Sequence, residues 1–125
     1  MGYEIEEVEE RVILVGVADG VMKEMEDSLD ELKELVRTAG ATVCGSLLQK
    51  REAVHPGTYI GKGKIQELKF LLFESEATGI VCDDELSPAQ MSNLERELDC
   101  KVMDRTLLIL DIFAQRAISS EGKIQ

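Results

Sequence analysis

The feature that most constrains the fold is a series of apolar runs, each followed by an amphipathic segment, along 125 residues. The first run, residues 11–17, reads RVILVGV and is apolar at nearly every position, which is typical of a central parallel strand. Further strands are expected at residues 42–50, 80–82 and 101–103. Strand–helix units in series predict right-handed crossovers and a parallel sheet.

Four helices are expected in the intervening and final segments: residues 28–39, 64–77, a third that begins at Pro88 and has Leu98 in its apolar stripe, and 106–118. The first is predicted to begin at Ser28, because Ser28 and Glu31 have the spacing of a capping box, and to end at a left-handed Gly40. Gly79 is expected to end the second helix, and Ser87 and Gln90 to cap the third.

These elements predict an α/β fold with an open four-stranded parallel sheet of order 2-1-3-4 and helices on both faces. That order places the most apolar strand inside the sheet. Residues 1–118 are expected to form this domain, and residues 119–125 the beginning of a helical linker that is cut short.

Composition excludes several classes of protein. With 44% hydrophobic and 31% charged residues, the chain is expected to be globular rather than disordered. No apolar run approaches the roughly 18 residues that cross a bilayer, and residues 1–10 lack the pattern of a signal peptide, so a cytoplasmic protein is expected. Cys44, Cys82 and Cys100 are interpreted as buried, inert thiols, and a single His disfavours a Cys/His zinc site.

The formal net charge of −11 disfavours a broad nucleic-acid-binding face, because such faces neutralise phosphates with cations. The acidic residues are unevenly distributed, with many at residues 4–10 and 24–34. A local basic loop on an acidic body is therefore compatible with the sequence.

Ligands of open α/β sheets bind beyond the carboxyl ends of the strands, near the point where the strand order reverses. Four loops are expected at that edge: residues 18–27, 51–63, 83–87 and 104–106. Functional side chains are sought there first.

The segment at residues 55–64, HPGTYIGKGK, is the most distinctive of these loops. It is one residue too short for a P-loop, and Gly63 stands where Ser or Thr would hold Mg2+. Two interpretations stay open: a turn that needs two glycines to enter a helix, or a phosphate contact with RNA or a nucleotide. The candidate contact residues are Arg51, His55, Tyr59 (as a stacking ring), Gly61, Lys62, Gly63 and Lys64.

Acidic residues follow the third strand, where Asp83 and Asp84 are weak candidates for a metal site. The alternative is that they stabilise the dipole of the next helix. Asp104 and Arg105 are expected to pair or cap locally. No catalytic constellation is found.

Three motifs in order resemble the N-terminal domain of the HflX family of ribosome-associated GTPases. They are residues 55–64, residues 84–90 with Asn93-Leu94-Glu95, and residues 102–117 (VMDRTLLILDIFAQRA). The resemblance covers roughly residues 11–125. It implies that a helical hairpin and a GTPase domain with its own P-loop would follow, so this chain by itself would not be a GTPase.

The resemblance also implies a function and partners. Family members bind the large ribosomal subunit and split or rescue stalled ribosomes under stress, with GTP and Mg2+ held by the GTPase domain. Arg105 falls in the third motif and joins the candidates for contact with ribosomal RNA. No cofactor is expected in this chain.

Two alternatives are kept. Some family members are reported to bind ATP through the N-terminal part, which supports a small nucleotide-binding domain with weak ATPase activity. The other is an interaction domain that regulates its own GTPase domain through the apolar last helix. The sequence does not predict the oligomeric state, because Leu107, Leu108 and Ile109 would invite self-association if they were left uncovered.

Overall fold

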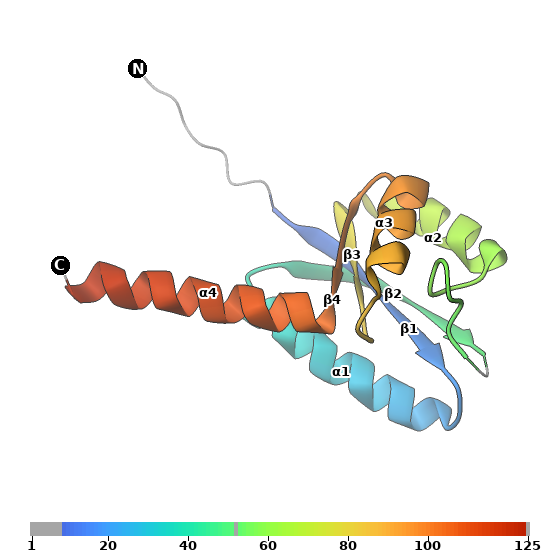
Figure 1. Ribbon diagram of the computed structural model, residues 1–125, viewed down its shortest axis with the longest axis horizontal. Coiled ribbons are helices and arrows are strands. Elements are labelled where there is room, and N and C mark those ends of the chain that lie inside the picture. The colour runs from blue at the N-terminus through green and yellow to red at the C-terminus, as the bar shows by residue number, and fades with distance from the viewer. Residues whose placement is uncertain (1–8, 52, 125) are drawn as a thin grey trace, which may run out of the picture.

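The sheet has four parallel strands in the order β2-β1-β3-β4, which confirms the predicted architecture. The computed structural model describes residues 9–51 and 53–124, with side chains through residue 114. The strands are β1 (Arg11–Ala18), β2 (Thr42–Lys50), β3 (Gly79–Cys82) and β4 (Lys101–Asp104). The helices are α1 (Met22–Thr38), α2 (Lys62–Ser75), α3 (Pro88–Leu98) and α4 (Arg105–Ile124) (Figure 1).

Part of two predicted segments lies outside this description. Of the acidic N-terminal stretch, residues 1–8 are not described. The predicted linker at residues 119–125 falls in the last turns of α4, whose side chains are not described, and at residue 125.

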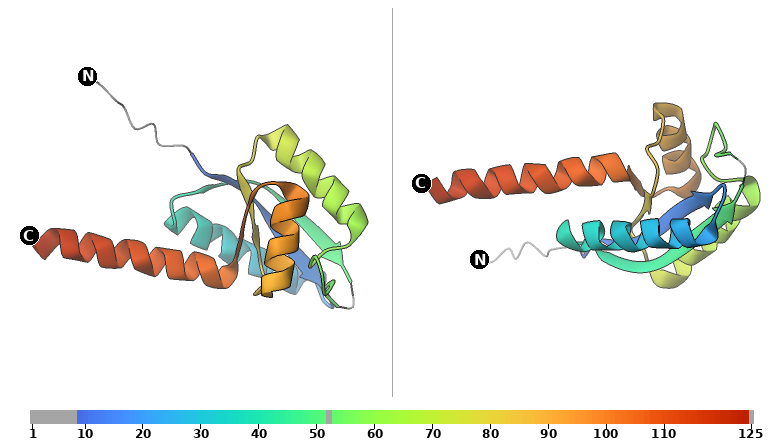
Figure 2. Two further views of the ribbon diagram at one scale, coloured as in Figure 1. Left: turned by 45° about the horizontal axis from the view of Figure 1, so that its top comes forward. Right: turned by 90° about the horizontal axis from the view of Figure 1, so that it is seen from below.

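Strand β1 is buried on both faces because helices cover both sides of the sheet. Its Ile13, Val15 and Val17 pack in a cluster with residues of α2 and α3. Val12 and Leu14 pack on the opposite face, with α1 and Leu108 of α4. Figures 1 and 2 show these layers, with α4 extending away from the body of the domain.

Helix α1 begins at Met22, six residues before the predicted start, so the capping box at Ser28 is wrong. Val21 occupies the N-cap position without a side-chain cap. The earlier start follows from Met25, which continues the apolar stripe of α1 onto the sheet. The predicted end is correct: Gly40 has φ +92 just after the helix.

The second helix is displaced by two residues from its prediction. Glu76, with φ 55, ends α2 in a left-handed conformation, so the prediction that Gly79 ends it is wrong. Gly79 instead lies in β3, where an added Cβ would be 2.6 Å from the carbonyl oxygen of Lys101. For α3, the capping box of Ser87 and Gln90 is present as predicted.

Candidate functional site

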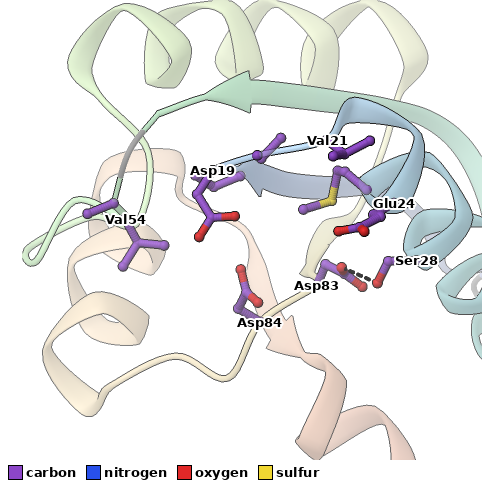
Figure 3. A pocket seen from close by; sticks show the side chains of 12 residues that line it. Asp19, Val21, Glu24, Ser28, Val54, Asp83 and Asp84 are labelled. Atoms are coloured by element: carbon purple, nitrogen blue, oxygen red, sulfur yellow. Dashed lines mark hydrogen bonds between the residues drawn. The ribbon is translucent and has the colours of Figure 1, made fainter.

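A cavity of about 450 Å³ lies at the carboxyl edge of the sheet, between the loops that follow β1 and β3 (Figure 3). This is where the strand order reverses, the usual ligand position in such folds. Four acidic residues and no cation line it: Asp19, Glu24, Asp83 and Asp84. Such a lining disfavours phosphate.

Asp83 and Asp84 are engaged with protein groups rather than arranged around a metal. No group of three or more His, Cys, Asp or Glu residues in the described part of the chain is arranged to hold a metal ion. The two neighbouring carboxylates contact different elements of the fold.

Asp83 joins β3 to α1 and α4. Its Oδ2 accepts a hydrogen bond of 2.6 Å from Ser28 Oγ, and its Oδ1 lies 3.4 Å from Arg105 Nη2. The same Nη2 donates to the carbonyl oxygen of Ser28 at 3.0 Å. The Asp83 side chain is only 5% exposed, so this charge depends on these partners.

Asp84 holds the loop before α2. Its Oδ2 accepts a hydrogen bond of 2.6 Å from the hydroxyl of Tyr59. Tyr59 is 1% exposed and has φ 68. Burial, followed by the hydrogen bond and charge of Asp84, raises the pKa of Tyr59 above its usual value, so it stays protonated as a donor.

The loop itself is closed by its own hydrogen bonds and fixed to α3. The backbones of His55 and Tyr59 exchange two hydrogen bonds, of 3.0 and 2.8 Å. Nδ1 of His55 accepts from the amides of Gly57 and Thr58. From α3, Gln90 Nε2 donates to the carbonyl oxygen of His55 at 2.9 Å.

Helix α2 begins with its terminal amides lacking a side-chain cap. Gly61 occupies the N-cap position, and the first turn holds no acidic residue. Lys62 is exposed, and Lys64 makes an i,i+3 ion pair with Glu67 at 3.0 Å. Uncapped amides and cations at a helix start attract anions.

Neither glycine at the start of α2 is required by the backbone. Gly40 alone among the described glycines has a positive φ, so Gly61 and Gly63 do not. A Cβ at Gly63 would meet nothing within 4 Å, but one at Gly61 would lie 3.3 Å from side-chain atoms of Arg51 and Gln49. Gly63 is therefore not needed for entry into the helix, whereas a side chain at Gly61 would require Arg51 and Gln49 to move.

The structure brings most of the predicted contact residues together, but it buries Tyr59 and places Arg105 apart from the others. Arg51 lies beside Gly61, while His55 and Lys62 line a cavity of about 280 Å³. The ring of Tyr59 is buried in the core and has no free face on which a base could stack. Arg105 lies on the α1 side of the sheet, where it contacts Ser28 and Asp83.

The three sequence motifs contact one another, which the sequence did not reveal. Gln90 and Asn93 of the second motif donate hydrogen bonds to the carbonyl oxygens of His55 and Gly57 in the first. Asp104 of the third accepts from the amide of Leu86 in the second at 2.8 Å and also caps α4 through the amide of Leu107. The motifs thus stabilise one loop arrangement.

The cysteines supply no reactive thiol at this edge. Cys82 is buried, as predicted, whereas Cys44 and Cys100 are half-buried. Burial raises the pKa of Cys82, and it raises that of Cys100 to about 11. Among the helices of the described residues, none has the length and apolar character of a membrane span.

Comparison with known proteins identifies relatives of the whole domain. The model of the family of GTP-binding GTPase N-terminal domains matches residues 26–114. A GTPase HflX of Lacrimispora saccharolytica is 63% identical over 122 residues, which are 98% of this chain and 29% of that protein. A GTPase HflX of Escherichia coli K12 is 44% identical over 116 residues, 93% of this chain and 27% of that protein.

A solved structure shares the fold. A GTP-binding protein from the archaeon Sulfolobus solfataricus, in complex with GDP, superposes with a TM-score of 0.63 at 28% identity, over 83% of this chain and 30% of that chain. The chain spans less than a third of the length of the curated relatives described above.

Proposed function

Because the chain belongs to the family of GTP-binding GTPase N-terminal domains found in HflX proteins, we propose that it is the ribosome-binding N-terminal part of an HflX-type GTPase. Its partner is the large ribosomal subunit, and the process is the splitting or rescue of stalled ribosomes under stress. The start of α2 contacts RNA phosphates. GTP hydrolysis, with its Mg2+, belongs to a segment outside these 125 residues.

The uncapped start of α2 carries this proposal. Its first amides lack a side-chain cap, and two lysines flank a glycine that the backbone does not require. A glycine in a helix lowers stability, so its presence without a steric reason favours close approach of a ligand to the backbone. A phosphate group would accept from these amides and face both ammonium groups.

Charge supports the same position. Residues 50–64, called the basic segment below, hold four cations and one acid in a chain of net charge −11. The cavity beside it is lined by acids and would repel RNA. A small basic area on an acidic body restricts phosphate contact to this edge.

Co-sedimentation of the full-length protein with large ribosomal subunits tests the proposal. The double variant Lys62→Ala/Lys64→Ala is expected to bind several-fold more weakly than the wild type. The control Lys23→Ala/Lys33→Ala removes two exposed lysines from α1, on the opposite face of the sheet, and is expected to bind as the wild type does. Equal binding by all three proteins would remove α2 from the interface.

Nucleotide binding with weak ATPase activity is a second candidate. The observation that favours it is the cavity of about 280 Å³ next to the start of α2, which is lined by one cation and one acid, Lys62 and Glu97, together with His55, Thr58, Ile65 and Gln66. Its volume is slightly below the range of roughly 300–1,000 Å³ that is usual for small-molecule sites. Calorimetric titration of the protein with ATP and Mg2+ tests this candidate, and the absence of both heat and a thermal shift would eliminate it.

Regulation of the attached GTPase domain is a third candidate. Leu110 and Phe113 of α4 are 58% and 60% exposed, an apolar surface suited to contact with the rest of the protein. Comparing the GTPase rate of the full-length protein with that of a form lacking residues 1–118 tests it. Unchanged rates would exclude a regulatory role.

A further inference from the structure

We propose that the adjacent residues Asp83 and Asp84 couple the basic segment to the start of α4, so that a contact at the segment changes the direction in which α4 leaves the domain. Asp84 contacts the segment, Asp83 contacts α4, and the two share a peptide bond. The meaning of the coupling as a response to RNA rests on the proposed function.

Tyr59 is the connection on the loop side. It lies two residues before the N-cap of α2, and two backbone hydrogen bonds join it to His55. Its ring is fixed in the core while its hydroxyl reaches Asp84 at 2.6 Å. Movement of residues 55–60, the hydrogen-bonded part of the basic segment, therefore acts on the Asp84 carboxylate through Tyr59.

Arg105 is the connection on the α4 side. It is the first residue of α4, and its guanidinium lies against both Ser28 of α1 and Asp83, the residue directly after β3. Leu108, one turn later, is buried in the core beside α1. The direction of α4 is therefore set by contacts of its first turn, one of which includes Asp83.

The ion pair of Asp83 and Arg105 has unused hydrogen-bonding atoms that would permit a second arrangement. Among the described side chains, only Asp83 Oδ1 and Arg105 Nε are buried nitrogen or oxygen atoms without a hydrogen-bond partner. One is an acceptor and the other a donor, and they belong to the same ion pair. A small shift of α4 would let the guanidinium donate two hydrogen bonds to the Asp83 carboxylate, with loss of its present hydrogen bond to the carbonyl oxygen of Ser28.

Hydrogen exchange of the protein without RNA tests the coupling independently of the proposed function. Tyr59→Phe removes only the hydroxyl that reaches Asp84. It is expected to speed exchange several-fold at the amides of residues 107–110, at the start of α4. Ser75→Ala, which removes a hydroxyl that donates to Leu71 at 2.6 Å, is the matched control and is expected to leave these amides unchanged.

Coupling is reciprocal, so a substitution on the α4 side supplies a second measurement, made at the loop. Ser28→Ala is expected to speed exchange at the amides of residues 57–59 in the loop, although Ser28 lies on the other face of the sheet. Changes confined to the loop in Tyr59→Phe, and to α1 and α4 in Ser28→Ala, would overturn the proposal. Ribosome binding by the same variants tests the proposed function and not the coupling, because hydrogen exchange is measured without ribosomes.

Discussion

Ser28 donates a hydrogen bond of 2.6 Å to the carboxylate of Asp83, 55 residues further along the chain. The serine lies inside α1 rather than at its start, and its hydroxyl is used for a tertiary contact. The bond joins the helix to the end of a central strand at the point where α4 also begins. A residue with the sequence signature of a cap thus serves the junction of three elements.

Ser28→Ala is expected to destabilise the domain by about 1–3 kcal/mol, because the Asp83 carboxylate stays buried and loses a donor. Urea denaturation measures the change in the free energy of unfolding. Ser92→Ala, an exposed position on α3, is the control. If the two substitutions have equal effects, the contact with Asp83 does not contribute to stability.

Val21→Ser is expected to stabilise the domain by about 1 kcal/mol, because it supplies the side-chain cap that α1 lacks. Val21 is 61% exposed, so little apolar burial is lost. The midpoint of urea denaturation is expected to rise. An unchanged or lower midpoint would mean that α1 gains nothing from a cap at this position.

Gly63→Ala is expected to separate stability from binding. The new Cβ meets no atom, so α2 becomes more stable by up to about 1 kcal/mol. The same Cβ covers part of the surface through which RNA would reach the helix start, so affinity for large subunits is expected to fall. Thermal denaturation and co-sedimentation are measured together, and unchanged affinity with raised stability would count against a phosphate at Gly63.

High pH is expected to destabilise the domain through the half-buried thiol of Cys100. Burial raises the pKa of Cys100 to about 11, with smaller contributions from Asp99 and Glu95, from a usual value near 9.0. Between these values the unfolded chain loses the thiol proton while the folded chain keeps it, so the free energy of unfolding falls as pH rises. Cys100→Ala is expected to flatten this decline, measured by urea denaturation from pH 8 to pH 11, roughly the range in which thiols titrate. Identical slopes for the two proteins would show that Cys100 does not titrate in this way.

The strand positions could be predicted because apolar runs are visible in the local sequence. Their order could be predicted because right-handed crossovers are a general rule of parallel sheets. The start of α1 could not, because Met25 extends the helix through packing on the sheet, against the weaker local preference of Ser28 for a cap. The left-handed end of α2 falls on Glu76 rather than on a glycine, and Ala77, the next residue, packs against the core.

The candidate site was partly visible in the sequence. Lysines and glycines before a helix indicate an anion contact, and the structure places them at an uncapped helix start. The burial of Tyr59 and the position of Arg105 could not be foreseen, because both depend on partners, Asp84 and Ser28, that are distant in sequence. An aromatic residue and a cation in a loop carry no local signal of such contacts.

Contact between the start of α2 and RNA phosphates is tested most directly by the salt dependence of binding to large ribosomal subunits. The affinity of the full-length protein is measured at a series of KCl concentrations, for the wild type, Lys62→Ala/Lys64→Ala and the control Lys23→Ala/Lys33→Ala. If both lysines neutralise phosphates, the plot of log affinity against log salt is shallower by about 2 for the first variant and unchanged for the control. Equal slopes for the wild type and the Lys62→Ala/Lys64→Ala variant would contradict the contact.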